Sequence, residues 1–182
     1  MKNGWGVSFH ANGKKSYEGE WHNDKRDGDG KEFDDDGDLL YDGTWKNKRY
    51  EGFGIAYKKG LKIYEGNWKL GHRLGKGISF LTNESKEYEG NWKFNNKDSI
   101  GVSFYENGAV KYHGDWKNNS YCGTGDLYNE SGVVIYKGEW KYGKREGSGI
   151  LYYDNGIKKY EGDFRDDKRN GKGIEWDDQG NI

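Results

Sequence analysis

The stretch Tyr17-Glu18-Gly19-Glu20-Trp21 contains the pattern that decides the fold of this chain. Its odd positions are aromatic or glycine and its even positions are acidic, an alternation that is typical of a β-strand with one buried face. The tyrosine of this pattern returns every 24 residues, once after 23, at Tyr17, Tyr41, Tyr64, Tyr88, Tyr112, Tyr136 and Tyr160. Self-similarity at such a period indicates a linear array of repeats.

Each repeat also contains a second strand pattern. Seven residues after most of the tryptophans comes a Gly-x-Gly, as at Gly28 and Gly30, with an aromatic residue three positions further on. Glycine weakens a strand unless a neighbour needs the space, so both glycines are predicted to be slots for Trp or Tyr rings. Short polar stretches join the two strands, and pairs such as Asn12-Gly13 follow the second strand. These pairs are strong hairpin signals.

This pattern resembles the MORN (membrane occupation and recognition nexus) repeat. The resemblance is carried by Tyr17-Glu18-Gly19-Glu20-Trp21, Tyr64-Glu65-Gly66-Asn67-Trp68 and Tyr88-Glu89-Gly90-Asn91-Trp92, and it covers the whole chain. It implies an all-β fold in which consecutive β-hairpins form one elongated, twisted antiparallel sheet. We therefore expect a single array over residues 1–182, with about seven repeats of 23–24 residues and a leading half repeat at 4–16.

Three positions depart from the pattern. Ser99 replaces the first glycine of its Gly-x-Gly, Phe164 replaces the last tryptophan, and Glu84 stands where a turn glycine is expected. The stretch from Glu84 to Ser99 is our first candidate for a kink or a specialised surface. Sequence drift at tolerant positions explains these departures equally well.

The charge balance and the single cysteine limit the classes of function. Thirty basic and 31 acidic residues nearly cancel, so no whole-protein field attracts nucleic acid or anionic lipid, and we expect no nucleic-acid partner. Cys122 is the only cysteine, which excludes an intramolecular disulfide. No apolar run reaches the length of a signal-peptide core or a membrane span. We expect a cytoplasmic protein.

Candidate metal and cofactor sites are weak. The four histidines lack metal-ligand spacing, and His113 takes a strand position that is expected to face solvent. Eight acidic residues surround the single Lys31: Asp27, Asp29, Glu32, Asp34, Asp35, Asp36, Asp38 and Asp42. Their order does not match a calcium-binding loop between helices, so a solvated acidic patch or a partner-facing surface is favoured over a hard-cation site. We expect neither a metal nor a cofactor.

Basic pairs recur in the turns, at Lys25-Arg26, Lys48-Arg49, Lys144-Arg145 and Lys168-Arg169. A row of such pairs along one edge of the sheet would suit phosphates or lipid head groups. Acidic neighbours such as Asp24 and Glu146 dilute the pairs, which favours a solvated, salt-screened edge.

Catalysis finds little support in this sequence. It contains no Gly-x-Ser-x-Gly elbow and no persuasive Cys/His pair, and an extended ribbon lacks the deep pocket that catalysis usually requires. We therefore expect no enzyme activity.

The leading functional hypothesis is a non-catalytic scaffold, a rigid β-ribbon whose aromatic trough binds a protein segment. The candidate anchors are Trp45, Trp68, Trp92 and Trp116, as far as their rings are exposed. If the rings are instead stacked on the glycines, they are core and the partner surface lies elsewhere. Strand edges at the ends of the array would also permit an end-to-end homo-oligomer.

Two alternatives remain open. The resemblance to MORN repeats implies peripheral membrane association through acidic phospholipid head groups. A lower-ranked alternative is an accessory or immunity-type protein that neutralises another protein.

Overall fold

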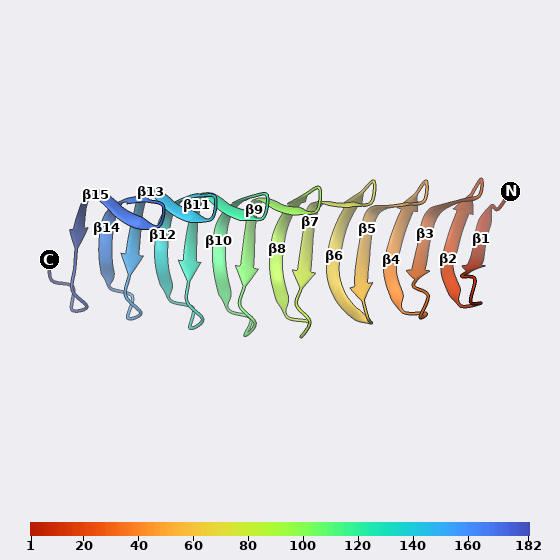
Figure 1. Cartoon of the computed structure of the whole chain (residues 1–182), viewed down its shortest axis with the longest axis horizontal. Coiled ribbons are helices and arrows are strands. Elements are labelled where there is room, and N and C mark those ends of the chain that lie inside the picture. Colours follow the sequence, from red (N-terminus) through yellow and green to blue (C-terminus); the bar gives the residue numbers. More distant parts are fainter. The chain divides into compact units, whose positions relative to one another are not determined.

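The computed structural model describes residues 1–182, which form fifteen β-strands and no helix. The strands are hydrogen-bonded in the order of the sequence, each antiparallel to the next wherever its register is defined (Figure 1). Their bounds are Gly4–Phe9 (β1), Lys15–His22 (β2), Lys25–Phe33 (β3), Leu39–Lys46 (β4), Arg49–Lys58 (β5), Leu61–Lys69 (β6), His72–Phe80 (β7), Lys86–Lys93 (β8), Asn96–Phe104 (β9), Val110–Lys117 (β10), Ser120–Tyr128 (β11), Val134–Lys141 (β12), Lys144–Tyr152 (β13), Lys158–Arg165 (β14) and Lys168–Glu175 (β15). The expected all-β fold of consecutive hairpins is confirmed.

The contacts divide the chain into two compact units. The first unit comprises Met1–Ser85 with Trp92–Asn95, and the second comprises Lys86–Asn91 with Asn96–Ile182. The division falls within the stretch in which the sequence departs from its own pattern. The single array over residues 1–182 and the kink near this stretch stay predictions.

Two kinds of turn alternate along each unit, at opposite ends of the strands (Figure 1). The tight turns have two residues, both with positive φ, as at Asn23 (47°) and Asp24 (61°). This conformation matches the twist of the flanking strands. The turns at the other end are five-residue loops such as 10–14, in which the His10 N–H donates to the Lys14 carbonyl at 2.8 Å and the Gly13 N–H to the His10 carbonyl at 3.0 Å. The turn between β5 and β6 is the exception, because it consists of Lys59 and Gly60 alone.

The core of each unit is a regular series of aromatic rings. Tyr17 and Tyr41 are fully buried, and the hydroxyl of Tyr17 donates to the backbone carbonyl of Glu20 at 3.0 Å. The indole N–H of Trp45 donates to the carbonyl of Gly30 at 3.1 Å, and its ring meets Tyr17 edge-on with centroids 5.3 Å apart. Each tryptophan thereby joins its own repeat to the preceding one.

The two glycines of each Gly-x-Gly have different roles. A Cβ added at the second glycine, Gly54, would lie 2.1 Å from the hydroxyl oxygen of Tyr41, which confirms that this glycine is a slot for a ring. The slot interpretation is wrong for the first glycine. Gly52 has φ 65°, and a Cβ there would meet only Thr44, at 3.6 Å. The first glycine is needed because the backbone is left-handed at the β-bulge between Gly43 and Trp45.

The departures from the pattern adopt the same backbone as the glycines they replace. Ser99 has φ 59° and Glu84 has φ 62°. This left-handed backbone conformation destabilises a residue that has a Cβ by about 1–2 kcal/mol.

Candidate interaction surface

The four candidate anchors are core residues. Trp45, Trp68, Trp92 and Trp116 are only 2%, 9%, 4% and 5% exposed. Trp68, for example, lies between the rings of Tyr41 and Tyr64, with centroid distances of 5.6 and 5.0 Å, and donates its indole N–H to the Gly54 carbonyl at 3.1 Å. The rings were candidate anchors only as far as they are exposed, and their burial makes them core residues, which is the alternative stated above.

The aromatic face is also covered by a second row of side chains. The residue five positions after each core tryptophan, or after Phe164 in the last repeat, lies over the tyrosine ring of the preceding strand. In two repeats this residue is a tyrosine, and Tyr50 stacks on Tyr41 with centroids 3.7 Å apart. In the others it is a cation, as at Arg26, whose guanidinium lies 4.7 Å from the centre of the Tyr17 ring. The row is Arg26, Tyr50, Arg73, Lys97, Tyr121, Arg145 and Arg169.

Acidic side chains on the same face pair with these cations. Glu32 accepts hydrogen bonds from Arg26 at 2.5 Å and from the Tyr50 hydroxyl at 2.6 Å. Burial, followed by the hydrogen bond to Glu32, raises the pKa of Tyr50 above its ordinary value. Lys97 pairs with Glu87 at 2.7 Å. Charge on this face is therefore largely satisfied within the protein.

The basic turn pairs do not form one row of exposed charge. Arg26 and Arg145 lie over the rings of Tyr17 and Tyr136 on the aromatic face, whereas Lys25 is exposed and donates to the Asn47 side chain at 3.0 Å. Successive side chains of a strand point to opposite faces, which separates Lys25 from Arg26 and Lys144 from Arg145.

The acidic residues around Lys31 are dispersed among separate partners. Asp42 pairs with Lys31 itself at 2.9 Å, and Asp35 lies 2.8 Å from the ring of His10. Asp34 accepts the backbone N–H groups of its own turn. The structure contains no group of three or more His, Cys, Asp or Glu side chains that could hold a metal ion. His113 is exposed, as its strand position predicts.

Three tight turns present large apolar side chains, which the sequence patterns did not single out. The first residue of the tight turn is Asn or Asp in four turns, but Leu70, Phe94 or Tyr142 in the others. Their φ angles are 51°, 47° and 52°, and they are 57%, 64% and 83% exposed. We refer to these three residues as the turn tips. The sequence does carry a signal for them, namely a bulky residue at the repeat position that Asn23 and Asn47 occupy in other repeats.

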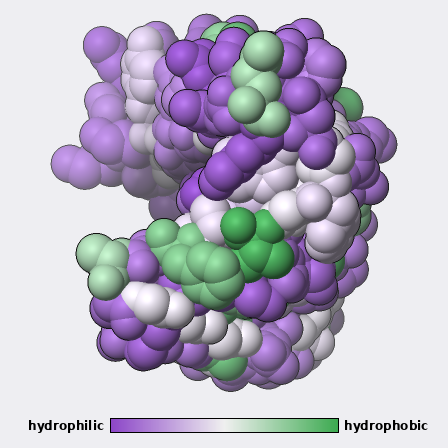
Figure 2. Space-filling view, turned by 90° about the vertical axis from the view of Figure 1, so that its right-hand side faces the viewer, coloured by the Kyte–Doolittle hydropathy of each residue, from purple (hydrophilic) through white to green (hydrophobic).

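Other exposed apolar side chains lie on the strands. Phe53 in β5 is 55% exposed and Ile100 in β9 is 61% exposed. Trp5 and Phe9 in β1 are 67% and 64% exposed, and Figure 2, viewed from the end at which β1 lies, shows apolar side chains at the surface there. None of these strand residues has the left-handed backbone of the turn tips.

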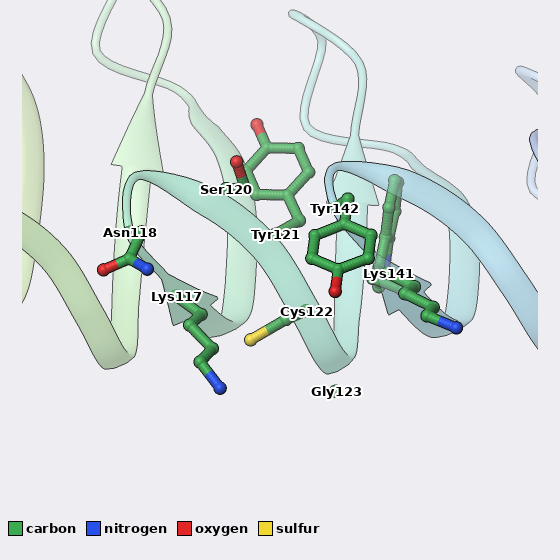
Figure 3. A pocket seen from close by; sticks show the side chains of 9 residues that line it. Lys117, Asn118, Ser120, Tyr121, Cys122, Gly123, Lys141 and Tyr142 are labelled. Atoms are coloured by element: carbon green, nitrogen blue, oxygen red, sulfur yellow. The ribbon is translucent and has the colours of Figure 1, made fainter.

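An open groove of about 510 Å³ lies beside the turn tip of the second unit. It is lined by Lys117, Asn118, Ser120, Tyr121, Cys122, Gly123, Trp140, Lys141 and Tyr142 (Figure 3). Burial, with a contribution from the Asp115 carboxylate, raises the pKa of the Cys122 thiol. Because the thiolate is the nucleophilic form, this cysteine is not an activated nucleophile.

The chain has no helix with the length and apolar character needed to cross a membrane.

Comparison with known families agrees with this repeat geometry. The family model described as MORN repeat matches residues 17–39, 41–61, 64–83, 88–110, 112–133, 136–158 and 160–182. A comparison with curated proteins gave no match. Each matched segment begins at or beside a core tyrosine and extends through the following Gly-x-Gly strand. The chain belongs to the MORN repeat family.

Proposed function

We propose that this protein is a non-catalytic scaffold that holds a protein partner through its turn tips. MORN repeats generally serve as interaction or membrane-associated modules. The observation that carries the proposal is the left-handed backbone of three exposed, bulky side chains, Leu70, Phe94 and Tyr142. Strain of this kind concentrates at functional sites.

The turn tips are costly for the fold alone. Asn and Asp tolerate the left-handed region, and Asn23, Asn47 and Asn118 occupy the same position in other turns. A leucine or aromatic residue there costs about 1–2 kcal/mol of conformational energy and exposes apolar surface. A partner that covers these side chains recovers their hydrophobic free energy.

The first unit offers two tips on successive tight turns. Leu70 follows β6 and Phe94 follows β8, so two strand spacings separate the turns, on the order of 10 Å. The ring of His72 meets that of Phe94 edge-on at 6.1 Å between centroids. An apolar helix or extended segment laid along this edge would contact both tips without rearrangement of the sheet.

Proteins of the MORN family are generally non-catalytic. The polar groups of the aromatic core support the same assignment here, because the repeated tyrosine hydroxyls and nearly all of the indole N–H groups donate to backbone carbonyls.

The test replaces all three tips with the residue that the other turns use. A Leu70→Asn, Phe94→Asn, Tyr142→Asn variant should fold at least as stably as the wild type, because asparagine favours this backbone. We expect it to lose a protein that the immobilised wild-type chain captures from source-cell lysate, measured by quantitative mass spectrometry.

The matched control changes exposed apolar residues on the strands. A Phe53→Thr, Ile100→Thr variant should retain the same captured protein. Loss of capture in this control, with retention in the triple variant, would overturn the proposal.

A second candidate function is peripheral membrane association, and one observation favours it. Each turn tip follows a lysine, namely Lys69, Lys93 and Lys141. Apolar tips beside lysines suit the boundary between acyl chains and anionic head groups. Sedimentation with vesicles of phosphatidylcholine, with and without phosphatidylserine, tests it. Binding that needs phosphatidylserine and is lost at high salt would support this function, whereas no sedimentation in either case would exclude it.

A further inference from the structure

In three repeats the residue six positions after the tryptophan is an acid that caps the next tight turn. The Asp27 carboxylate accepts a hydrogen bond from the Lys46 ammonium group at 3.0 Å and another from the backbone N–H of Asn47 at 3.2 Å. The hydrogen bond from Lys46, followed by that from Asn47, lowers the pKa of Asp27. The same arrangement joins Glu51 to the Leu70 N–H at 3.0 Å, Glu146 to the Asp166 N–H at 3.1 Å, and Asn3 to the Asn23 N–H at 2.9 Å.

The carboxylate is missing beside the turn tip of the second unit. By repeat position, Cys122 corresponds to Asp27, Lys141 to Lys46 and Tyr142 to Asn47. A thiol is a weak hydrogen-bond acceptor and carries no charge when protonated. The Tyr142 N–H and the ammonium groups of Lys141 and Lys117 make no hydrogen bond or ion pair within the protein. The hydrogen bond from Lys144 lowers the pKa of the Asp166 carboxyl, and the charge of Lys141 adds to this effect.

The groove of about 510 Å³ opens at this missing carboxylate. Figure 3 shows the side chains of Lys117, Cys122 and Tyr142 around the opening, while the Tyr121 ring lies on the other side of β11. The Lys141 side chain points away from Cys122, on the far side of the Tyr142 ring (Figure 3). The Tyr142 N–H and Lys117 are thus the donors beside the opening, and the space for an external acceptor is accessible from solvent.

Two acids lie near Cys122, and both are engaged elsewhere. Asp115, opposite Cys122 in the strand pair, accepts the Thr124 N–H at 3.0 Å. Asp98, at the capping position of the preceding repeat, accepts the Ser99 hydroxyl at 3.2 Å. Leu74 is the other capping position without a carboxylate, and the following turn there carries Phe94, whose ring meets His72.

We propose that this groove binds an aspartate or glutamate side chain from an acidic segment of a protein partner. The incoming carboxylate takes the place of the one that Asp27 supplies in its own repeat. It is held by the Tyr142 N–H and by the Lys141 ammonium, which turns from its present direction to the one that Lys46 takes toward Asp27. Lys117 adds positive charge, and the exposed Tyr142 ring covers the neighbouring residue of the segment. The claim that a protein partner supplies the carboxylate rests on the proposed function. The claim that the groove binds a carboxylate does not.

The test is a titration of the ¹⁵N-labelled full chain with N-acetyl-aspartate N-methylamide, followed by amide chemical shifts. We expect a saturable shift of the Tyr142 amide, and tighter binding of a short acidic peptide than of its amide counterpart, in which Gln and Asn replace Glu and Asp. Cys122→Ser should leave both results unchanged. Cys122→Asp should place a carboxylate in the site, shift the Tyr142 amide before any ligand is added and weaken peptide binding about tenfold.

Three results would overturn the proposal. The first is equal peptide binding by the Cys122→Ser and Cys122→Asp variants, and the second is unchanged binding after Lys141→Gln. The third is a saturable shift with inorganic phosphate but none with the carboxylate probe, because this would assign the site to phosphate. If these tests fail while the wild-type chain still captures a protein through its turn tips, the carboxylate site is refuted and the proposed function is not.

Discussion

Alanine substitution of two glycines in one repeat separates the two glycine roles. Gly54 faces the Tyr41 ring, whose hydroxyl oxygen and Cζ would lie 2.1 and 2.4 Å from an added Cβ. Gly52, two residues earlier, has φ 65°, and an added Cβ would make only ordinary van der Waals contact with Thr44, at 3.6 Å. We expect Gly54→Ala to destabilise the protein far more than Gly52→Ala, although both changes add one methyl group.

The magnitudes follow from what each methyl group displaces. The buried Tyr41 ring would have to move, which loses its hydrogen bond to the Thr44 carbonyl (3.1 Å) and its stacking on Tyr50 (3.7 Å). Overpacking of this kind costs about 1–3 kcal/mol, and loss of the hydrogen bond adds about 0.5–1.5 kcal/mol. At Gly52 the left-handed backbone costs about 1–2 kcal/mol, of which the lower entropy of the unfolded alanine chain offsets about 0.4–1 kcal/mol.

Urea unfolding followed by tryptophan fluorescence measures both changes, and Gly60→Ala gives a further left-handed control outside the bulge. Equal losses of unfolding free energy at Gly52 and Gly54, or a larger loss at Gly52, would refute the separate roles of the two glycines.

Three further predictions concern other repeats. Ser99→Gly removes a left-handed serine (φ 59°) and should stabilise the protein by about 0.5–1 kcal/mol in the same urea assay; destabilisation would contradict the strain argument. Phe164→Trp supplies the missing indole donor to the Gly149 carbonyl and should add about 0.5–1.5 kcal/mol, with a protected indole N–H signal by NMR; a solvent-exposed signal would count against it. Burial raises the pKa of Tyr64 and Tyr136 from 10.0 to about 12. Stability should therefore be full below pH 10 and fall as the pH rises from 10 to 12, because the unfolded chain loses these protons first. Tyrosinate absorbance measures the ionisation of these tyrosines as the pH rises. Ionisation near pH 10 in the folded protein would refute the raised pKa values.

Much of the fold could be predicted from the sequence because its determinants are local and repeated. The interval between Tyr17 and Tyr41, and the alternation around each, specify strands, hairpins and their order. The role of Gly52 could not be predicted in this way. A glycine that gives room to a ring and a glycine that permits positive φ look identical in sequence, and only the bulge between Gly43 and Trp45 distinguishes them.

The interaction surface was less predictable for a related reason. Aromatic side chains serve equally well as core and as binding anchors, so a repeated tryptophan such as Trp68 does not reveal which role it has. The structure places it between Tyr41 and Tyr64. Nothing in the composition singles out Leu70 and Phe94 as candidate contact residues. Only their positive φ angles and their exposure do so.

Hydroxyl-radical footprinting of the chain, alone and with its captured partner, tests the central claim most directly. We expect oxidation of Leu70, Phe94 and Tyr142 to fall in the complex, while that of Phe53 and Ile100, which are similarly exposed, stays unchanged. Protection of Phe53 and Ile100 with unchanged oxidation at the turn tips would contradict it.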